Sequence, residues 1–249
     1  MSTIIIQQDK IFYELSKKNF TAEIIKSPNA CGDVFISKSI IYQSQEYKII
    51  SIKENSFKSN SKIESIKFSE DSNLRSIKKK SFSLSSIKAL FIPSNVEELE
   101  EGWCCNTSNL EEVILSSGNK NFKYLDDKHQ IIIGKSDKNS DIFDTIIFAC
   151  RNIKSVTIPK EIKYIKSYAF CDCEELKVIE ISKDSELLSI GKKSFECTSI
   201  KSLFIPSNFE CFGEGWCNDT EDLTEVKISP ENKNFKYLDN KHQIILGKS

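Results

Sequence analysis

The sequence predicts a β-rich repeat solenoid in which short parallel strands stack coil on coil. Three features of the 249 residues indicate this fold: a long block that occurs twice, apolar triplets that recur within each block, and prolines that directly follow several triplets. One unit of this kind cannot bury its apolar side alone, whereas stacked units share a continuous core. The triplets are therefore expected to form one common interior.

The larger repeat is nearly identical over a long stretch. Residues 119–136 have the sequence NKNFKYLDDKHQIIIGKS and residues 232–249 have NKNFKYLDNKHQIILGKS. The same offset of 113 residues (232 − 119) pairs Phe82 with Phe195 and Trp103 with Trp216. The two copies of the block therefore cover about 47–136 and 160–249.

The smaller repeat is a triplet of apolar residues with spacing +3, +2. Its eight members start at residues 31, 63, 87, 110, 153, 176, 200 and 223, so most starts are 23–24 residues apart, and an insertion separates the fourth from the fifth. The last two residues of a triplet alternate as on a strand and share one face. Proline follows Ile92, Ile158 and Ile205, and it ends a strand because it has no N–H for the ladder.

A second set of apolar pairs is expected on the wall opposite the triplets. The pairs are Ile52/Phe57, Ile77/Phe82, Leu99/Trp103, Ile165/Phe170, Ile190/Phe195 and Phe212/Trp216.

A sandwich of antiparallel hairpins is the alternative fold. It predicts turns every 8–12 residues, which the longer period of 23–24 residues does not match.

The remaining segments predict hairpins and a cap. In the insertion, two β-rich runs at 122–125 and 130–133 flank a polar turn and predict a β-hairpin, which recurs at 235–246. Residues 1–30 do not follow the unit and are assigned to an amino-terminal cap, with a hairpin at 8–15, before a solenoid over 31–249. The chain stops after a hairpin. This is consistent with truncation, with a hairpin that caps the stack, or with self-association through an open carboxyl-terminal edge.

Composition and charge exclude several classes of partner. The formal net charge is −1, so no nucleic-acid partner is expected. No apolar run approaches the length of a membrane helix and no signal peptide is visible, so membrane insertion is not expected. Nine cysteines form no disulfide framework and are expected to be mainly buried thiols in a reducing compartment.

The candidates for chemistry are few. His129 and His242 occupy the same place in the two blocks, and each block has an equivalent cysteine, Cys104 or Cys217. A Cys–His nucleophile pair is conceivable, but duplicated structural residues explain this pattern better than two identical active sites. Cys171-Asp172-Cys173 lacks the second half of a zinc site. We therefore expect no catalytic residue, no metal and no cofactor.

The outward positions of the triplet strands are the candidate partner-binding face. Phe91 and Phe204 are notable because a large aromatic side chain that points to water often marks a partner site. Alternatively, a neighbouring loop or the hairpin covers each phenylalanine. The predicted face consists of Lys88, Phe91, Glu112, Ile114, Lys154, Thr157, Lys201, Phe204, Glu225 and Lys227.

Several consecutive units resemble a known family. SIKALFIPS (86–94), NIKSVTIPK (152–160) and SIKSLFIPS (199–207) are similar to the BspA-like leucine-rich repeats of bacterial and parasite surface antigens. The resemblance implies a leucine-rich repeat solenoid and suggests a cell-surface protein that adheres to host-cell or matrix proteins. An intracellular scaffold for protein–protein interaction is the alternative function, and a cytoplasmic location remains open.

Overall fold

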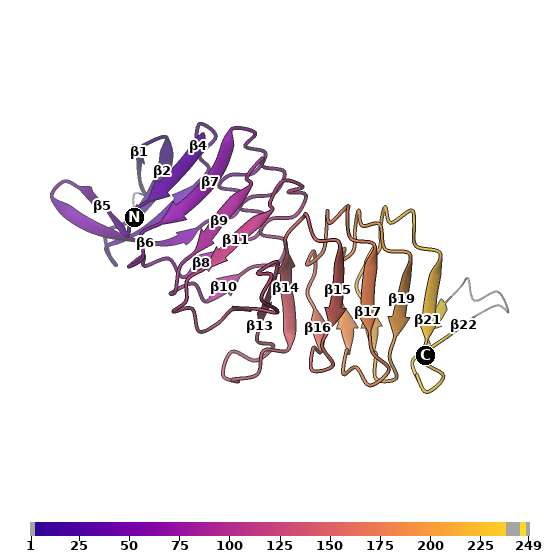
Figure 1. Cartoon of the computed structure of the whole chain (residues 1–249). Helices are drawn as coiled ribbons and strands as arrows, with labels where there is room; N and C mark the ends of the chain where they lie inside the picture. Colours follow the sequence, from indigo (N-terminus) through magenta and orange to yellow (C-terminus); the bar gives the residue numbers. More distant parts are fainter. Residues whose placement is uncertain (1–2, 238–244, 248–249) are drawn as a thin grey trace. The chain divides into compact units, whose positions relative to one another are not determined.

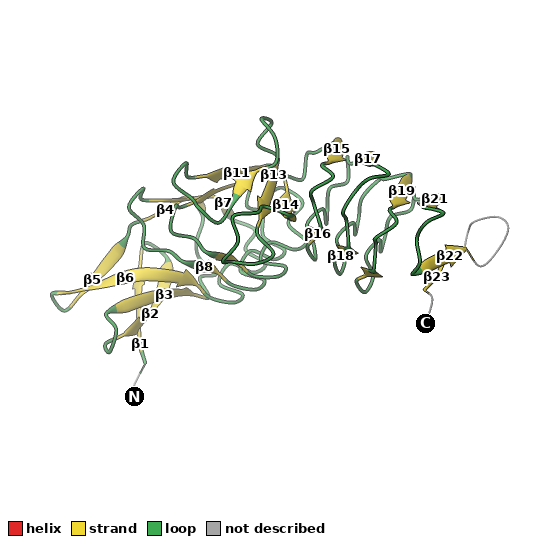
Figure 2. Cartoon of the chain, turned by 90° about the horizontal axis from the view of Figure 1, so that it is seen from below, coloured by secondary structure: helices red, strands yellow, loops and turns green. Residues whose placement is uncertain are grey.

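The computed structural model describes residues 3–237 and 245–247. The chain divides into two compact units, Met1–Lys123 and Tyr124–Ser249. Within the described residues the regular structure consists of β-strands (Figures 1 and 2). The cap and solenoid boundaries expected at residues 30 and 31 stay a prediction.

The first unit has two facing walls of parallel strands. One wall is the sheet β11-β9-β7-β4, and its neighbouring strands all pair in parallel. The opposite wall continues β6-β8-β10, also in parallel. The bounds are β4 (Gly32–Ile36), β7 (Ile63–Phe68), β9 (Ala89–Ile92), β11 (Glu112–Leu115), β6 (Gln45–Ile52), β8 (Ser76–Ile77) and β10 (Glu98–Leu99).

Antiparallel strands begin this unit. The strands β1 (Ile4–Gln8), β2 (Ile11–Ser16) and β3 (Thr21–Ile25) form a meander, and β3 pairs in parallel with β6. The turn of the first hairpin lies at Asp9 and Lys10, between β1 and β2. The range 8–15, expected to be a whole hairpin, therefore contains only this turn and most of β2, and the partner strand is β1. Both turn residues have positive φ, which suits a two-residue turn between twisted strands. A further hairpin pairs β5 (Ser39–Tyr42) with β6.

The second unit repeats the two-walled plan. On one wall β15 pairs with β17 and β19 with β21, and on the other the order is β14-β16-β18-β20, all in parallel. The bounds are β15 (Ser155–Ile158), β17 (Val178–Ile181), β19 (Ser202–Ile205), β21 (Glu225–Ile228), β14 (Thr145–Ala149), β16 (Tyr164–Ile165), β18 (Ser189–Ile190) and β20 (Cys211–Phe212).

The duplicated segments form short strands, as expected. In the first, β12 (Lys123–Tyr124) neighbours β13 (Ile131–Gly134), and the Leu125 amide donates to the Ile131 carbonyl over 2.9 Å. The strand β13 then pairs antiparallel with β14. In the second, β22 (Phe235–Tyr237) pairs antiparallel with β23 (Ile245–Gly247).

The triplets point inward and form the core of each unit. Ile66 and Leu90 are buried and lie side by side in the first unit, as do Val156 and Ile179 in the second. Three strands end at the residue before proline, namely β9, β15 and β19. The predicted β-rich solenoid of stacked parallel strands is therefore confirmed.

Aromatic side chains from the second apolar set fill the space near the return turns. Phe57 stacks on Phe82 with ring centroids 5.3 Å apart, and Trp103 meets Phe82 edge-on at 6.1 Å. The second unit repeats this arrangement with Phe170 on Phe195 at 5.1 Å and Trp216 edge-on at 6.4 Å. Both geometries are favourable for aromatic pairs.

Candidate functional site

The first unit carries a row of outward side chains across its triplet wall. Phe35 lies opposite Lys67, and Phe91 lies opposite Ile114, on neighbouring parallel strands. Phe35 is 67% exposed and Ile114 is 38% exposed, whereas Phe91 is half-buried. We call these four residues the apolar row, because three of them are large and apolar.

A groove follows the apolar row. All four of its residues line the groove, together with Phe68, Ser69 and Glu70 at the end of β7, and its volume is about 480 Å³. This volume falls within the range of pockets that take a small molecule or a large side chain. Because the floor is a hydrogen-bonded sheet, the groove is formed before any partner arrives.

A second row lies two residues towards the strand starts. Asp33, Ser65, Ala89 and Glu112 are register neighbours on successive strands, and we call them the acidic row. The Ser65 hydroxyl donates to Asp33 Oδ1 over 2.5 Å. The acidic row contains two carboxylates and no cation.

The predicted residue Lys88 lies just outside the acidic row. Its Nζ is 3.5 Å from Glu64 Oε2, and both side chains are more than half exposed. Such a pair contributes at most about 1 kcal/mol to stability. The pair matters for the charge of the face. Because Glu64 compensates the charge of Lys88, this lysine does not neutralise the carboxylates of the acidic row, Asp33 and Glu112.

The equivalent row of the second unit is polar. Phe204 lies opposite Lys227, and Thr157 donates its hydroxyl to Glu180 Oε2 over 2.8 Å. Phe204 is half-buried and packs against the hydrophobic core of this unit. Lys227 therefore occupies the position that Ile114 has in the first unit, so the register neighbour of Phe204 is charged and not aliphatic.

Exposed lysines lie on the triplet wall of the second unit, and one of them, Lys227, is the register neighbour of Phe204. Lys227 lies 3.1 Å from Glu225 Oε2, and Lys154 lies 3.3 Å from Glu175 Oε2. Lys201 is also exposed, at the start of the coil that contains Phe204. The residues predicted as one binding face therefore belong to two faces of different chemistry, one in each unit.

Two contributors to the face of the first unit escaped the sequence prediction. Phe35 and Lys67 occupy the outward positions of the first two triplets, but the predicted face began only at the third. The available signal was the triplet Cys31/Val34/Ile36, whose middle gap places Phe35 outward. Only the register of β4 against β7 shows that Phe35 continues the line of Phe91 and Ile114.

The candidates for nucleophilic chemistry lie in unsuitable environments. His129 stacks on Tyr124 with ring centroids 4.2 Å apart, in a turn where its φ is 58°. Cys104 is buried, and burial raises the pKa of the Cys217 thiol. A raised pKa disfavours the thiolate, which is the reactive form. His242 lies outside the described residues.

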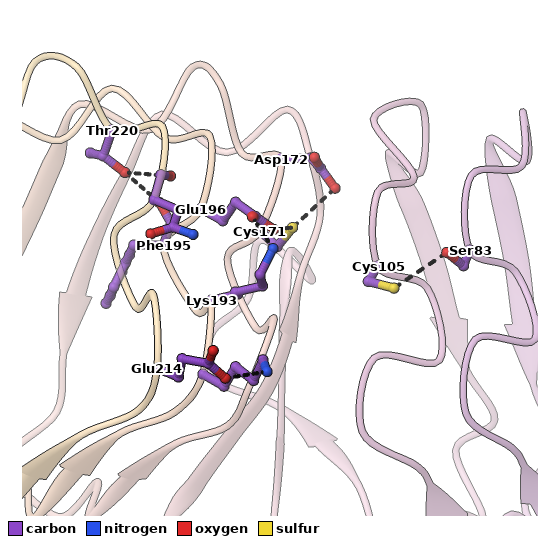
Figure 3. Close-up of polar contacts among 11 residues, drawn as sticks. Ser83, Cys105, Cys171, Asp172, Lys193, Phe195, Glu196, Glu214 and Thr220 are labelled. Atoms are coloured by element: carbon purple, nitrogen blue, oxygen red, sulfur yellow. Dashed lines mark hydrogen bonds and ion pairs between the residues drawn. The ribbon is translucent and has the colours of Figure 1, made fainter.

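The pair Cys171 and Cys173 makes separate contacts in one turn. Cys171 Sγ lies 3.2 Å from Asp172 Oδ2 (Figure 3), whereas Cys173 Sγ lies 3.7 Å from the Cys150 carbonyl. Burial raises the pKa of Cys173 to about 11. Neighbouring polar groups form ion pairs along the stacked turns, as Lys193 does with Glu196. No group of metal-binding side chains occurs among the described residues.

Asparagines anchor the duplicated segments, a role that the sequence did not reveal. Asn232 is buried, and its amide donates to the carbonyls of Pro206 and Phe209. Its Oδ1 accepts from the amides of Asn234 and Phe235, both over 2.8 Å. Asn119 makes the equivalent four bonds in the first unit. The side chain thus ties each insertion to the preceding coil.

The segment that follows β21, the last triplet strand, forms hydrogen bonds with the edge of this strand. The Ile228 amide donates to Tyr237 Oη over 2.8 Å, and Tyr237 Oη donates to the Val226 carbonyl over 2.9 Å. These bonds satisfy edge groups of β21 that a second chain would need. Self-association through this edge stays a prediction.

Stacked parallel strands with a 23–24-residue triplet period define this protein as a solenoid repeat protein. The family model described as BspA type Leucine rich repeat region matches residues 8–126 and 118–241, with six copies. The chain therefore belongs to the BspA-type leucine-rich repeat family. Proteins of this family are generally non-catalytic and generally bind other proteins.

Solved structures of leucine-rich repeat proteins are similar to this chain, and the first of those named here has the same fold. A leucine-rich repeat protein from Eubacterium ventriosum ATCC 27560 matches with a TM-score of 0.58 and 16% identity, over 94% of this chain and 74% of that chain. One from Bacteroides ovatus ATCC 8483 has a TM-score of 0.45 and 17% identity, over 92% and 77%. A search of curated proteins found no match. Across the described residues, no helix has the length and apolar character needed to span a bilayer.

Proposed function

We propose that this chain is a non-catalytic protein-recognition module that binds its partner through the apolar row of the first unit. The single observation that carries the proposal is the alignment of Phe35, Phe91 and Ile114 along a preformed groove. Exposed apolar side chains grouped in this way are typical of interaction sites, and aromatic residues dominate binding energy there.

The duplication supplies a matched control for this proposal. Phe91→Ser removes the centre of the groove, and Phe204→Ser makes the same change at the equivalent, lysine-rich position of the second unit. Each half-buried ring contributes about 1 kcal/mol to stability, so both variants are expected to fold. Peptides selected from a random displayed library on the wild-type protein should lose binding to Phe91→Ser by tenfold or more, or about 1.4 kcal/mol, and bind Phe204→Ser normally.

Equal losses in both variants, or none in either, would contradict the assignment to the first unit. Thermal unfolding of each variant provides the control for folding. A melting temperature that falls as far for Phe91→Ser as for a core phenylalanine would show that Phe91 is a structural residue.

The biological role that we propose is that of a surface antigen or adhesin that binds host-cell or matrix proteins. The support is family membership and the apolar groove of the first unit. Purified matrix proteins immobilised on a surface should retain the wild-type chain and Phe204→Ser, but not Phe91→Ser. Antibody labelling of intact, unpermeabilised cells of the source organism tests the location independently.

An intracellular scaffold is the second candidate, and the cysteines favour it. All nine lie among the described residues without forming a disulfide bond, and five of them are buried, as is typical of proteins from reducing compartments. Asn106 and Asn218 lie in exposed turns within Asn-X-Ser/Thr sequons. Glycans at these positions in native material would exclude the scaffold role, because N-glycosylation requires export.

A further inference from the structure

We infer that the partner segment of the first unit is extended and basic, with an apolar anchor in the groove and a lysine or arginine two residues away. This inference rests on the proposed function and specifies the chemistry of the partner. Its basis is the position of the acidic row beside the apolar row.

The spacing of the two rows matches an extended peptide. Residues two apart on a strand lie on the same face about 6.6 Å apart. Ile114 and Glu112 have this relation on β11, and Phe35 and Asp33 have it on β4. An extended segment lying along these strands therefore places one side chain over the apolar row and its i+2 neighbour over the acidic row.

The charges of the face favour a basic segment. The outward positions of the four triplet strands and the residues just before them carry four carboxylates against two lysines, a net charge of −2: Asp33, Glu64, Glu111 and Glu112 against Lys67 and Lys88. Lys88 is paired with Glu64. Glu111 and Glu112 are exposed, and among the described residues neither has a cation within ion-pair distance. These two carboxylates are available to a partner cation.

Lys67 determines where on the face the partner cation lies. It is exposed in the middle of the apolar row, on β7, and lines the groove. Its charge repels a partner lysine from the centre of the face. The cation is therefore directed towards Glu112 on β11, and the anchor towards the space between Phe91 and Ile114.

The second unit has the opposite charge at the same positions. Its outward residues include four lysines and two glutamates, a net charge of +2: Lys154, Lys177, Lys201 and Lys227 against Glu180 and Glu225. A basic segment is therefore repelled from the face of the second unit. The two faces, which lie on cores of the same design, thus discriminate between partners by charge. This is how electrostatic complementarity provides specificity.

Three labelled peptides test the inference. The first is a short Ser/Thr peptide with one phenylalanine and a lysine two residues away, the second has glutamate instead of lysine, and the third has alanine instead of phenylalanine. By fluorescence anisotropy at low salt, the lysine peptide should bind the wild-type chain about tenfold more tightly than the glutamate peptide. The preference should shrink with added salt, and the alanine peptide should bind weakly.

Charge-reversal variants at equivalent positions of the two units show which unit causes the preference for the lysine peptide. Glu112→Lys should abolish or invert the preference for the lysine peptide, whereas Glu225→Lys, the equivalent change in the second unit, should leave it unchanged. A glutamate peptide that binds as tightly as the lysine peptide would overturn the inference. If Phe91→Ser still abolished binding in that case, the proposed function would stand, and only the inference of a basic partner would fail.

A second copy of this chain is the competing occupant, because its second unit offers a basic face with a phenylalanine. Sedimentation velocity of the wild-type chain over a range of concentrations separates the two. A monomer across that range supports a foreign segment, and a dimer that dissociates in Glu112→Lys would overturn the inference in favour of self-association.

Discussion

The two units have cores of the same design, whereas their outward surfaces differ. Phe82 and Phe195 occupy equivalent, fully buried positions and make the same stacked and edge-on contacts. Ile114 and Lys227 also occupy equivalent register positions, but one extends an apolar groove and the other forms an exposed ion pair. Duplication therefore retained what the stack needs to pack, while the outward positions, which packing does not constrain, diverged.

The largest expected effect tests the shared core. Phe82→Ala and Phe195→Ala should each lower the free energy of unfolding by about 3–5 kcal/mol, because each leaves a cavity between stacked aromatic rings. The chain has two tryptophans, and Trp103 and Trp216 contact these phenylalanines edge-on. Urea unfolding followed by fluorescence in single-tryptophan variants therefore reports on each unit separately.

Equal losses in the two units would support a common core. A loss below about 1 kcal/mol at either position would mean that its ring is not a packed core residue. Phe20→Ala, at a side chain that is 48% exposed, is the control and should change stability far less.

The next effect concerns the asparagine anchors. Asn232→Ala removes four hydrogen bonds and leaves buried partners unsatisfied, so it should cost about 2–3 kcal/mol. Asn119→Ala should have a similar effect in the first unit. Hydrogen exchange of the Phe122 and Phe235 amides provides the measurement, and Asn208→Ala, at an exposed turn position, is the control. Unchanged protection in Asn232→Ala would show that the backbone holds the segment without the side chain.

A pH effect on stability is expected from a buried thiol of the second unit. Burial raises the pKa of the Cys173 thiol from its ordinary value of 9.0 to about 11 in the folded protein. The neutral thiol is therefore stabilised by folding, and this contribution is fully present below pH 9 and lost as pH rises from 9 through about 11. The expected loss is on the order of 2 kcal/mol.

Unfolding measured through Trp216 at several alkaline pH values tests this effect. Cys173→Ala has no thiol to ionise at this position, so its stability should fall less steeply over the same pH range. If wild type and Cys173→Ala respond equally, another group is responsible for the alkaline loss.

The smallest effect on stability is expected at the surface. Ile114→Lys copies the residue of the second unit into the first, and because the position is exposed, it should change stability by less than about 0.5 kcal/mol. It should nevertheless weaken binding of library-selected peptides by tenfold or more, about 1.4 kcal/mol. The reciprocal Lys227→Ile serves as the control and should leave that binding intact. Full binding by Ile114→Lys would remove Ile114 from the site.

Much of the fold was predictable because it follows from local periodicity. The triplet spacing predicted the inward positions of Ile66, Leu90 and Val156, since alternation on a strand fixes which side chains share a face. The prolines after Ile92 and Ile158 predicted the strand ends. The roles of Asn119 and Asn232 were not predictable, since their partners, Pro93 and Pro206 among them, lie 26 residues earlier in the chain.

The candidate site was predictable only in part. Phe91, Glu112 and Ile114 could be assigned to an outward face from alternation alone. Alternation also points Phe35 and Lys67 outward, but only the register of β4 on β7 shows that they lie opposite each other, because a bulge at Gly32 and Asp33 shifts the pairing by one residue. Sequence also did not show that the predicted face falls into two compact units, because Lys154, Thr157 and the other second-unit residues follow the same triplet spacing as those of the first.

By itself, the amino-acid sequence determined that the chain folds as stacked coils, because an apolar triplet every 23–24 residues has only a neighbouring triplet against which to bury its side chains. The tertiary structure alone decided which outward residues meet. Cross-strand neighbours are set by pairing between coils about two dozen residues apart. That pairing lines up Phe35, Phe91 and Ile114 in one unit and places Phe204 beside Lys227 in the other.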